Sequence, residues 1–127
     1  MRLVIETNII VSAFLTPNGN AAILMDKVFG EAYEVIVTKN ILVEYEEVLQ
    51  RKKFGFSEEI ISFVLTWFRE HAVLVDVNEN DYSKEDVPDP KDAVFYVAAR
   101  ATGSRLVTGN IKHYPVEEMR TMLWELM

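Results

Sequence analysis

The chain has 127 residues, of which half are hydrophobic, and it carries a formal net charge of −7 with no cysteine. This length suits one compact domain over residues 1–127, with enough apolar side chains for one substantial core. The lack of cysteine excludes a disulfide framework and a zinc–thiolate site, and the acidic balance is atypical of proteins that coat nucleic acid. The sequence contains no apolar run long enough to cross a membrane and no signal segment, so we expect a cytoplasmic protein.

The first third of the chain predicts a strand, two helices and a second strand. Residues 3–5 form a short apolar run that ends abruptly in polar residues, which is typical of a buried strand. Apolar residues at helical spacing predict helices over residues 8–15 and 20–30, separated by a loop rich in Asn, Pro and Gly. The β-branched and aromatic run 33–37 predicts the second strand.

Two capped helices and a third strand follow. Helical spacing predicts a helix over residues 41–49, with Thr38 or Asn40 as its N-cap. Ser57 is a good N-cap for the next helix, and the apolar residues 72–77 predict the third strand.

The last part of the chain predicts a helix, a strand and a second helix. Helical spacing covers residues 92–102, and Gly103 is positioned to end that helix. Residues 105–108 predict a fourth strand. A proline and two glutamates favour a C-terminal helix over residues 116–126, and a strand near residues 119–123 is the alternative.

This alternation of strands and helices indicates an α/β fold, in which a parallel sheet is covered on both faces. The carboxyl ends of the strands in such a sheet share one edge, and that edge forms the ligand crevice. Polar residues at the ends of the strands are therefore the candidates for a functional site.

Three acids and one amide lie at such positions. Glu6 follows the first strand, Glu44 lies on the helix after the second, Asp92 begins the helix before the fourth, and Asn110 follows the fourth. Converging carboxylates repel one another unless a cation is present, and oxygen ligands without cysteine suit Mg²⁺ or Mn²⁺. We therefore expect a metal site with Glu6, Glu44 and Asp92 as ligands.

Three further polar residues are expected to support this site. Thr7 and Asn8 follow Glu6 directly and are suited to orient its carboxylate or a water molecule. Asp89 lies in the turn that precedes Asp92.

Each candidate also has a plainer interpretation. Glu6 can cap the following helix, and Glu44 can be a solvent-exposed residue of a glutamate-rich helix. Asp89 and Asp92 match the cap and the acid of a capping box, and Asn110 is a common turn residue.

Any contact with RNA must use local basic patches, because the chain as a whole is acidic. Residues 51–53 and 112–113 are the candidates. The alternative for the first patch is a solvated helix end. The alternative for His113 is a plain surface residue. The sequence has no glycine-rich nucleotide loop and no nucleophile elbow, which excludes dehydrogenases, P-loop enzymes and serine hydrolases.

Four blocks, taken in order, resemble the PIN domain family. The opening block 3–13 is similar to the hydrophobic-Asp-Thr-Asn-hydrophobic start of that family, and block 41–45 carries an acid that matches its second one. Residues 89–92 resemble the third block, and residues 106–115 resemble the fourth, where Asp or Asn is found. The fourth block points to the branch that contains toxin components of toxin–antitoxin pairs.

This resemblance implies a three-layer α/β/α sandwich with a central parallel sheet of four to five strands. It also implies a Mg²⁺- or Mn²⁺-dependent endoribonuclease that leaves a 5′-phosphate and a 3′-hydroxyl, forms a homodimer and is blocked by a cognate antitoxin. By the same resemblance Glu6, Glu44 and Asp92 would hold metal, Asn110 would orient a water molecule, and Thr108 would support the site from its strand.

One position departs from the family pattern, since Glu6 stands where the family has aspartate. The extra methylene moves the carboxylate by about 1.5 Å. A misplacement of about 1 Å can cost roughly a hundredfold in rate. The alternative function is therefore a PIN-fold binding module with weakened or lost catalysis.

Overall fold

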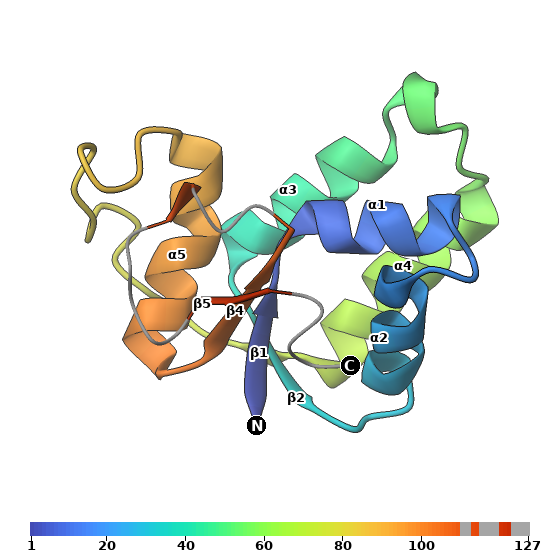
Figure 1. Ribbon diagram of the computed structural model, residues 1–127, viewed down its shortest axis with the longest axis horizontal. Helices are drawn as coiled ribbons and strands as arrows, with labels where there is room; N and C mark the ends of the chain where they lie inside the picture. The colour runs from blue at the N-terminus through green and yellow to red at the C-terminus, as the bar shows by residue number, and fades with distance from the viewer. Residues whose placement is uncertain (110–112, 115–119, 123–127) are drawn as a thin grey trace.

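The computed structural model describes residues 1–109, 113–114 and 120–122 (Figure 1). Over this part of the chain, five parallel strands form one sheet in the order β3-β2-β1-β4-β5. The strands are β1 (Arg2–Ile5), β2 (Glu34–Val37), β3 (Val73–Leu74), β4 (Arg105–Thr108) and β5 (Arg120–Met122). Strand β1 lies at the centre, so the residue that follows it is placed in the middle of the carboxyl edge.

Helices cover both faces of the sheet. Helix α5 lies to one side of β1 and β4, and α1, α2 and α4 lie to the other side (Figure 1). The described residues form the helices α1 (Thr7–Leu15), α2 (Asn20–Phe29), α3 (Lys39–Leu49), α4 (Glu58–His71) and α5 (Pro90–Thr102), and the short 3₁₀ helix η1 (Lys52–Phe54). The fold is the predicted α/β/α sandwich with a parallel sheet. None of the helices in the described part of the chain has the length and apolar character needed to cross a membrane.

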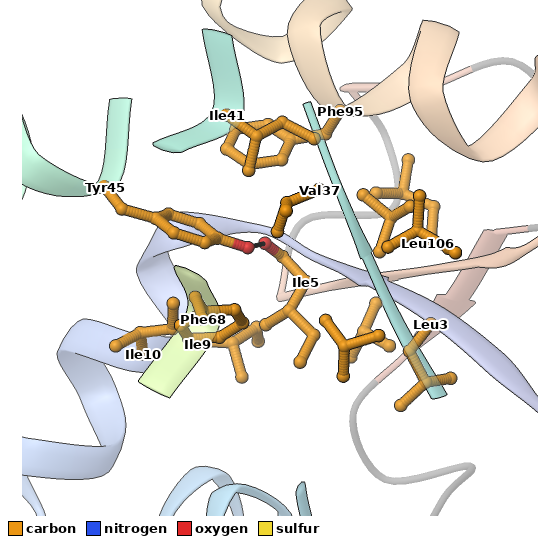
Figure 2. Packing of buried hydrophobic residues seen from close by; sticks show 14 of the residues in the cluster. Leu3, Ile5, Ile9, Ile10, Val37, Ile41, Tyr45, Phe68, Phe95 and Leu106 are labelled. Carbon is orange, nitrogen blue, oxygen red and sulfur yellow. Dashed lines mark hydrogen bonds between the residues drawn. The ribbon is translucent and has the colours of Figure 1, made fainter. Parts of the chain in front are cut away.

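The core is built from the apolar runs of the strands and the apolar faces of the helices. Figure 2 shows Leu3 and Ile5 of β1 among side chains from α1, α3, α4 and α5. Leu3 and Ile5 are completely buried, and so is Tyr45 of α3. The apolar run 3–5 therefore reads as a central strand buried on both faces.

Helix ends follow the capping residues in the sequence. Thr38 accepts a hydrogen bond from the backbone N–H of Ile41 and is the N-cap of α3, so Asn40 is not. Ser57 caps α4 in the same manner. Gly103 has φ +64°, a left-handed conformation that glycine adopts without strain, and it ends α5 as predicted.

The prediction of a helix over residues 116–126 is wrong for residues 120–122, which form strand β5 and so agree with the alternative of a strand near residues 119–123. Strand β4 pairs with β1 on one side only, so the backbone groups on its other edge need a partner. Strand β5 supplies that partner, with Val107 in register with Thr121. The rest of the predicted helix lies outside the described residues.

The third strand is shorter than predicted, because only Val73 and Leu74 of the run 72–77 are in the sheet. Both residues are exposed and lie at the sheet's outer edge. Short edge strands of this kind limit pairing with other chains.

Candidate active site

The carboxyl edge of the sheet carries a cleft of about 210 Å³, and most of the predicted site residues line it. Two residues of the predicted basic patches line it as well, namely Arg51 and His113. The predicted site residues in its lining are Glu6, Thr7, Asn8, Glu44, Asp89 and Asp92. Topology thus brings together residues from β1, α3 and α5 that are far apart in the sequence. Asn110 lies outside the described residues.

Glu6 is the most buried acid of the cleft, with 5% of its surface exposed. Its backbone occupies the N-cap position of α1, but its side chain makes no capping hydrogen bond. Instead, its Oε2 accepts a hydrogen bond of 3.0 Å from the Thr108 hydroxyl and one of 2.6 Å from the Tyr114 hydroxyl. The side chain of Glu6 is therefore committed to the site and not to the helix end.

Tyr114 is a contact that the sequence did not predict. Its side chain is buried, and burial together with the nearby Glu6 charge raises the pKa of its hydroxyl far above the ordinary value. The hydroxyl therefore stays protonated and acts as a donor. The available signal was its place in the fourth block, six residues after Thr108, where an aromatic side chain can fold back over the strand end.

Glu44 lies on the second turn of α3, half-buried, and reaches the cleft. Burial raises the pKa of its carboxyl above the ordinary value, whereas the positive charge of Lys91 acts in the opposite direction. The neighbouring Tyr45 donates a hydrogen bond of 2.6 Å to the carbonyl of Ile5 (Figure 2). This bond ties α3 to the end of β1 and so sets Glu44 relative to Glu6.

Asp92 lies on the first turn of α5, and its side chain is 18% exposed. Burial raises the pKa of its carboxyl, and the charge of Glu6 raises it further. His113 Nδ1 lies 3.2 Å from Asp92 Oδ2, and its charge lowers the same pKa. His113 thus lines the cleft and is also an exposed residue, since 51% of its side-chain surface is accessible.

Asp89 has the capping role that the sequence indicated. Its Oδ1 accepts a hydrogen bond of 2.9 Å from the backbone N–H of Lys91, which fixes the start of α5. Its charge also raises the pKa of the Glu44 and Asp92 carboxyls, so it acts on the site electrostatically.

The donor set is chemically suited to a hard divalent cation, although it is not a closed ligand cage. Among the described residues, no three acids or histidines are gathered closely enough to hold a metal ion. The buried Thr7 hydroxyl at the cleft has no hydrogen-bond partner there. Burial is the largest cause of the raised pKa values of the Glu44 and Asp92 carboxyls, and nearby carboxylates raise both further. Carboxylate and hydroxyl oxygens are ligands that Mg²⁺ and Mn²⁺ prefer.

Comparison with known proteins agrees with this architecture. The chain matches no curated protein. It is similar to the crystal structure of VapBC2 from Rickettsia felis bound to a DNA fragment from their promoter. That likeness has a TM-score of 0.63 at 18% sequence identity, covers 96% of this chain and 98% of that chain, and establishes the fold. The family model for the PIN domain matches residues 2–112, and the chain therefore belongs to the PIN domain family.

Proposed function

We propose that the chain is a single-domain endoribonuclease that depends on Mg²⁺ or Mn²⁺. The observation that carries this proposal is the placement of Glu6, Glu44 and Asp92 around one cleft of a PIN-domain fold. A bound divalent ion would supply charge for the phosphate and acidity for an attacking water molecule. The three carboxylates would hold the ion, with Thr108 and Tyr114 restraining Glu6.

The cleft also has cationic side chains suited to an RNA phosphate. Lys91 and Arg51 both line it, and both lower the pKa of Glu44 through their charge. Two local cations beside the carboxylates give an acidic protein a place to bind a phosphodiester. We assign to Lys91 and Arg51 the binding of phosphate oxygens next to the bond that is cut.

The proposed physiological role is that of a toxin in a toxin–antitoxin pair, acting in the cytoplasm as a homodimer that a cognate antitoxin blocks. The similarity to VapBC2 on its promoter DNA supports an antitoxin partner. A gene for a small DNA-binding protein beside the gene for this chain, and co-purification of the two products, would test this role.

The nuclease proposal is tested by incubating the purified protein with 5′-labelled RNA in Mn²⁺, in Mg²⁺ and in EDTA. We expect cleavage with Mn²⁺ or Mg²⁺ and none in EDTA. The products should carry a 5′-phosphate and a 3′-hydroxyl. Absence of cleavage over a broad set of RNA substrates in both metals would contradict the proposal.

Glu6 motivates the alternative of a binding module with weakened catalysis. The Glu6→Asp variant separates the two functions. A sharp gain in cleavage with this variant favours the alternative, whereas unchanged or reduced cleavage means that glutamate is the functional residue in this site.

A further inference from the structure

We propose that Tyr114 is a positioning residue, which together with Thr108 sets the reach of the acid at position 6 and requires glutamate there. This inference rests on the proposed metal site, because it concerns how Glu6 presents its carboxylate to a cation.

Both hydroxyls converge on a single oxygen of Glu6. Thr108 Oγ1 lies 3.0 Å from Oε2, and Tyr114 Oη lies 2.6 Å from the same atom. None of the three residues exceeds 5% exposure. Water therefore competes little for Oε2, and two donors on one oxygen fix both the position and the plane of the carboxylate.

The backbone fixes the point from which the side chain of residue 6 must reach. Strands β1 and β4 are paired in parallel, with Ile5 in register with Val107. The backbone N–H of Glu6 donates to the carbonyl of Val107 at 3.1 Å, so the pairing continues one residue beyond the strand. Thr108 therefore stands beside residue 6 whichever acid is present.

The side-chain length then decides whether Tyr114 can be reached. Removing one methylene withdraws the carboxylate by about 1.5 Å along the side chain. The contact with Tyr114 would lengthen from 2.6 Å to roughly 4 Å, which is beyond hydrogen-bond range. An aspartate at position 6 would thus lose Tyr114, and the reach of the two hydroxyls is matched to glutamate.

A purely structural role for Tyr114 makes a different prediction. If its ring only fills the core, loss of its hydroxyl affects metal binding equally with glutamate or aspartate at position 6. The hydroxyl also forms a hydrogen bond with the Asp92 carboxyl, which lowers the pKa of that group. If the hydroxyl positions Glu6, its loss therefore weakens metal binding more in the chain with glutamate than in the chain with aspartate.

The test is a double-mutant cycle in Mn²⁺ affinity, measured by isothermal titration calorimetry. The four proteins are the unsubstituted chain, Tyr114→Phe, Glu6→Asp and the double variant. We expect Tyr114→Phe to weaken Mn²⁺ binding by about tenfold or more in the unsubstituted chain. In the Glu6→Asp background we expect a clearly smaller loss, because there Tyr114→Phe removes only the hydrogen bond to Asp92.

Two further sets of variants keep the test independent of folding. Tyr33→Phe, at a half-buried tyrosine near β2, is the matched control and should leave the affinity unchanged. Thr108→Val removes the second donor to Oε2 with little change in side-chain volume. Thr108→Ser keeps a hydroxyl at this position and is its control. We expect the valine variant to bind Mn²⁺ less tightly than the unsubstituted chain, and the serine variant to keep most of the affinity. Thermal unfolding without metal checks that each variant folds. If Tyr114→Phe does not fold, the two Thr108 variants still test whether hydroxyl donors to Glu6 affect Mn²⁺ binding.

The outcomes separate this inference from the proposed function. If the unsubstituted chain binds no Mn²⁺, the metal site itself is wrong. If it binds Mn²⁺ and the Tyr114 and Thr108 variants bind equally well, the positioning role is wrong while the metal site stands. Equal losses from Tyr114→Phe in both backgrounds overturn the match to glutamate.

Discussion

The hydroxyl of Tyr45 lies 2.6 Å from the carbonyl oxygen of Ile5, and this contact joins the two elements that carry Glu6 and Glu44 (Figure 2). Tyr45 is fully buried and follows Glu44 directly on α3, while Ile5 is the last residue of β1. Burial raises the pKa of the Tyr45 hydroxyl, so it remains a donor. The spacing of two acids in the cleft thus depends on a bond inside the core.

Replacement of Tyr45 by phenylalanine removes this bond and leaves a buried carbonyl with one partner fewer. We expect Tyr45→Phe to lower the free energy of unfolding by about 1–2 kcal/mol. RNA cleavage should fall as well, because Glu44 is then held less firmly relative to Glu6. Urea denaturation and a cleavage assay check both effects. Tyr33→Phe is the control and should change stability by less than about 0.5 kcal/mol. Unchanged stability and cleavage in Tyr45→Phe would show that packing alone sets this spacing.

Loss of the Asp92 charge tests the role of that carboxylate as a metal ligand. Asp92→Asn keeps the size of the side chain, and we expect it to reduce Mn²⁺-dependent cleavage by roughly a hundredfold or more, since a direct ligand should count for more than a supporting residue. Circular dichroism should show an intact fold. Asp26→Asn, on the exposed side of α2, removes one charge away from the cleft and should cleave at the normal rate. Equal activity of the two variants would remove Asp92 from the site.

The pH dependence of stability follows from the raised pKa values of Asp92 and Glu44. Their ordinary values are 3.8 and 4.5, and in the folded chain both groups hold their protons to higher pH. The folded state therefore binds more protons than the unfolded state in this window, so the free energy of unfolding falls as pH rises through it. At a pH above the raised pKa values, both carboxyls are ionised in the folded chain, and the full loss of folding free energy is present.

At pH 7 the metal-free Asp92→Asn variant should consequently melt higher than the unsubstituted chain, by about 3–5 °C for a gain of about 1 kcal/mol. Mn²⁺ should raise the melting temperature of the unsubstituted chain and have little effect on the variant. Differential scanning fluorimetry with and without Mn²⁺ measures both. A variant that melts lower than the unsubstituted chain at pH 7 would contradict the cost of burying the ionised Asp92 carboxylate beside Glu6.

Lys91 tests the proposed phosphate contact. Lys91→Met keeps an apolar stem and removes the charge, so RNA binding should weaken and its dependence on salt should become shallower by about 0.7 in the log–log slope. Filter binding of the Asp92→Asn background at several salt concentrations measures this without cleavage. Lys27→Met, on the exposed side of α2, is the matched control. An unchanged slope in Lys91→Met would exclude a direct phosphate contact.

Those parts of the architecture that depend on local patterns were predictable from the sequence. The apolar run 3–5 predicted a buried strand, and Ser57 and Gly103 marked helix ends where the structure has them. Because carboxyl ends of parallel strands share an edge, the sequence also predicted that Glu6, Glu44 and Asp92 would face one cleft, and they line it.

Features that depend on contacts distant in sequence were not predictable. Helical spacing over residues 116–126 favoured the wrong alternative, because only the open edge of β4 explains why residues 120–122 form β5, within the alternative strand near residues 119–123. Likewise, the bond between Tyr114 and Glu6 spans 108 positions, and the place of Tyr114 in the fourth block does not by itself identify its partner. His113 is a surface residue, as one of the two interpretations had it, but its contact with Asp92 could not be predicted because Asp92 lies on another element.

The proposed nuclease reaction requires that Glu6, Glu44 and Asp92 jointly bind a divalent cation. Anomalous diffraction data from a crystal soaked in Mn²⁺ would locate that ion. We expect an anomalous peak in this cleft at a coordination distance of roughly 2.1–2.2 Å from carboxylate oxygens of these residues. A cleft without manganese, in a protein that still cleaves RNA in the same buffer, would contradict this requirement.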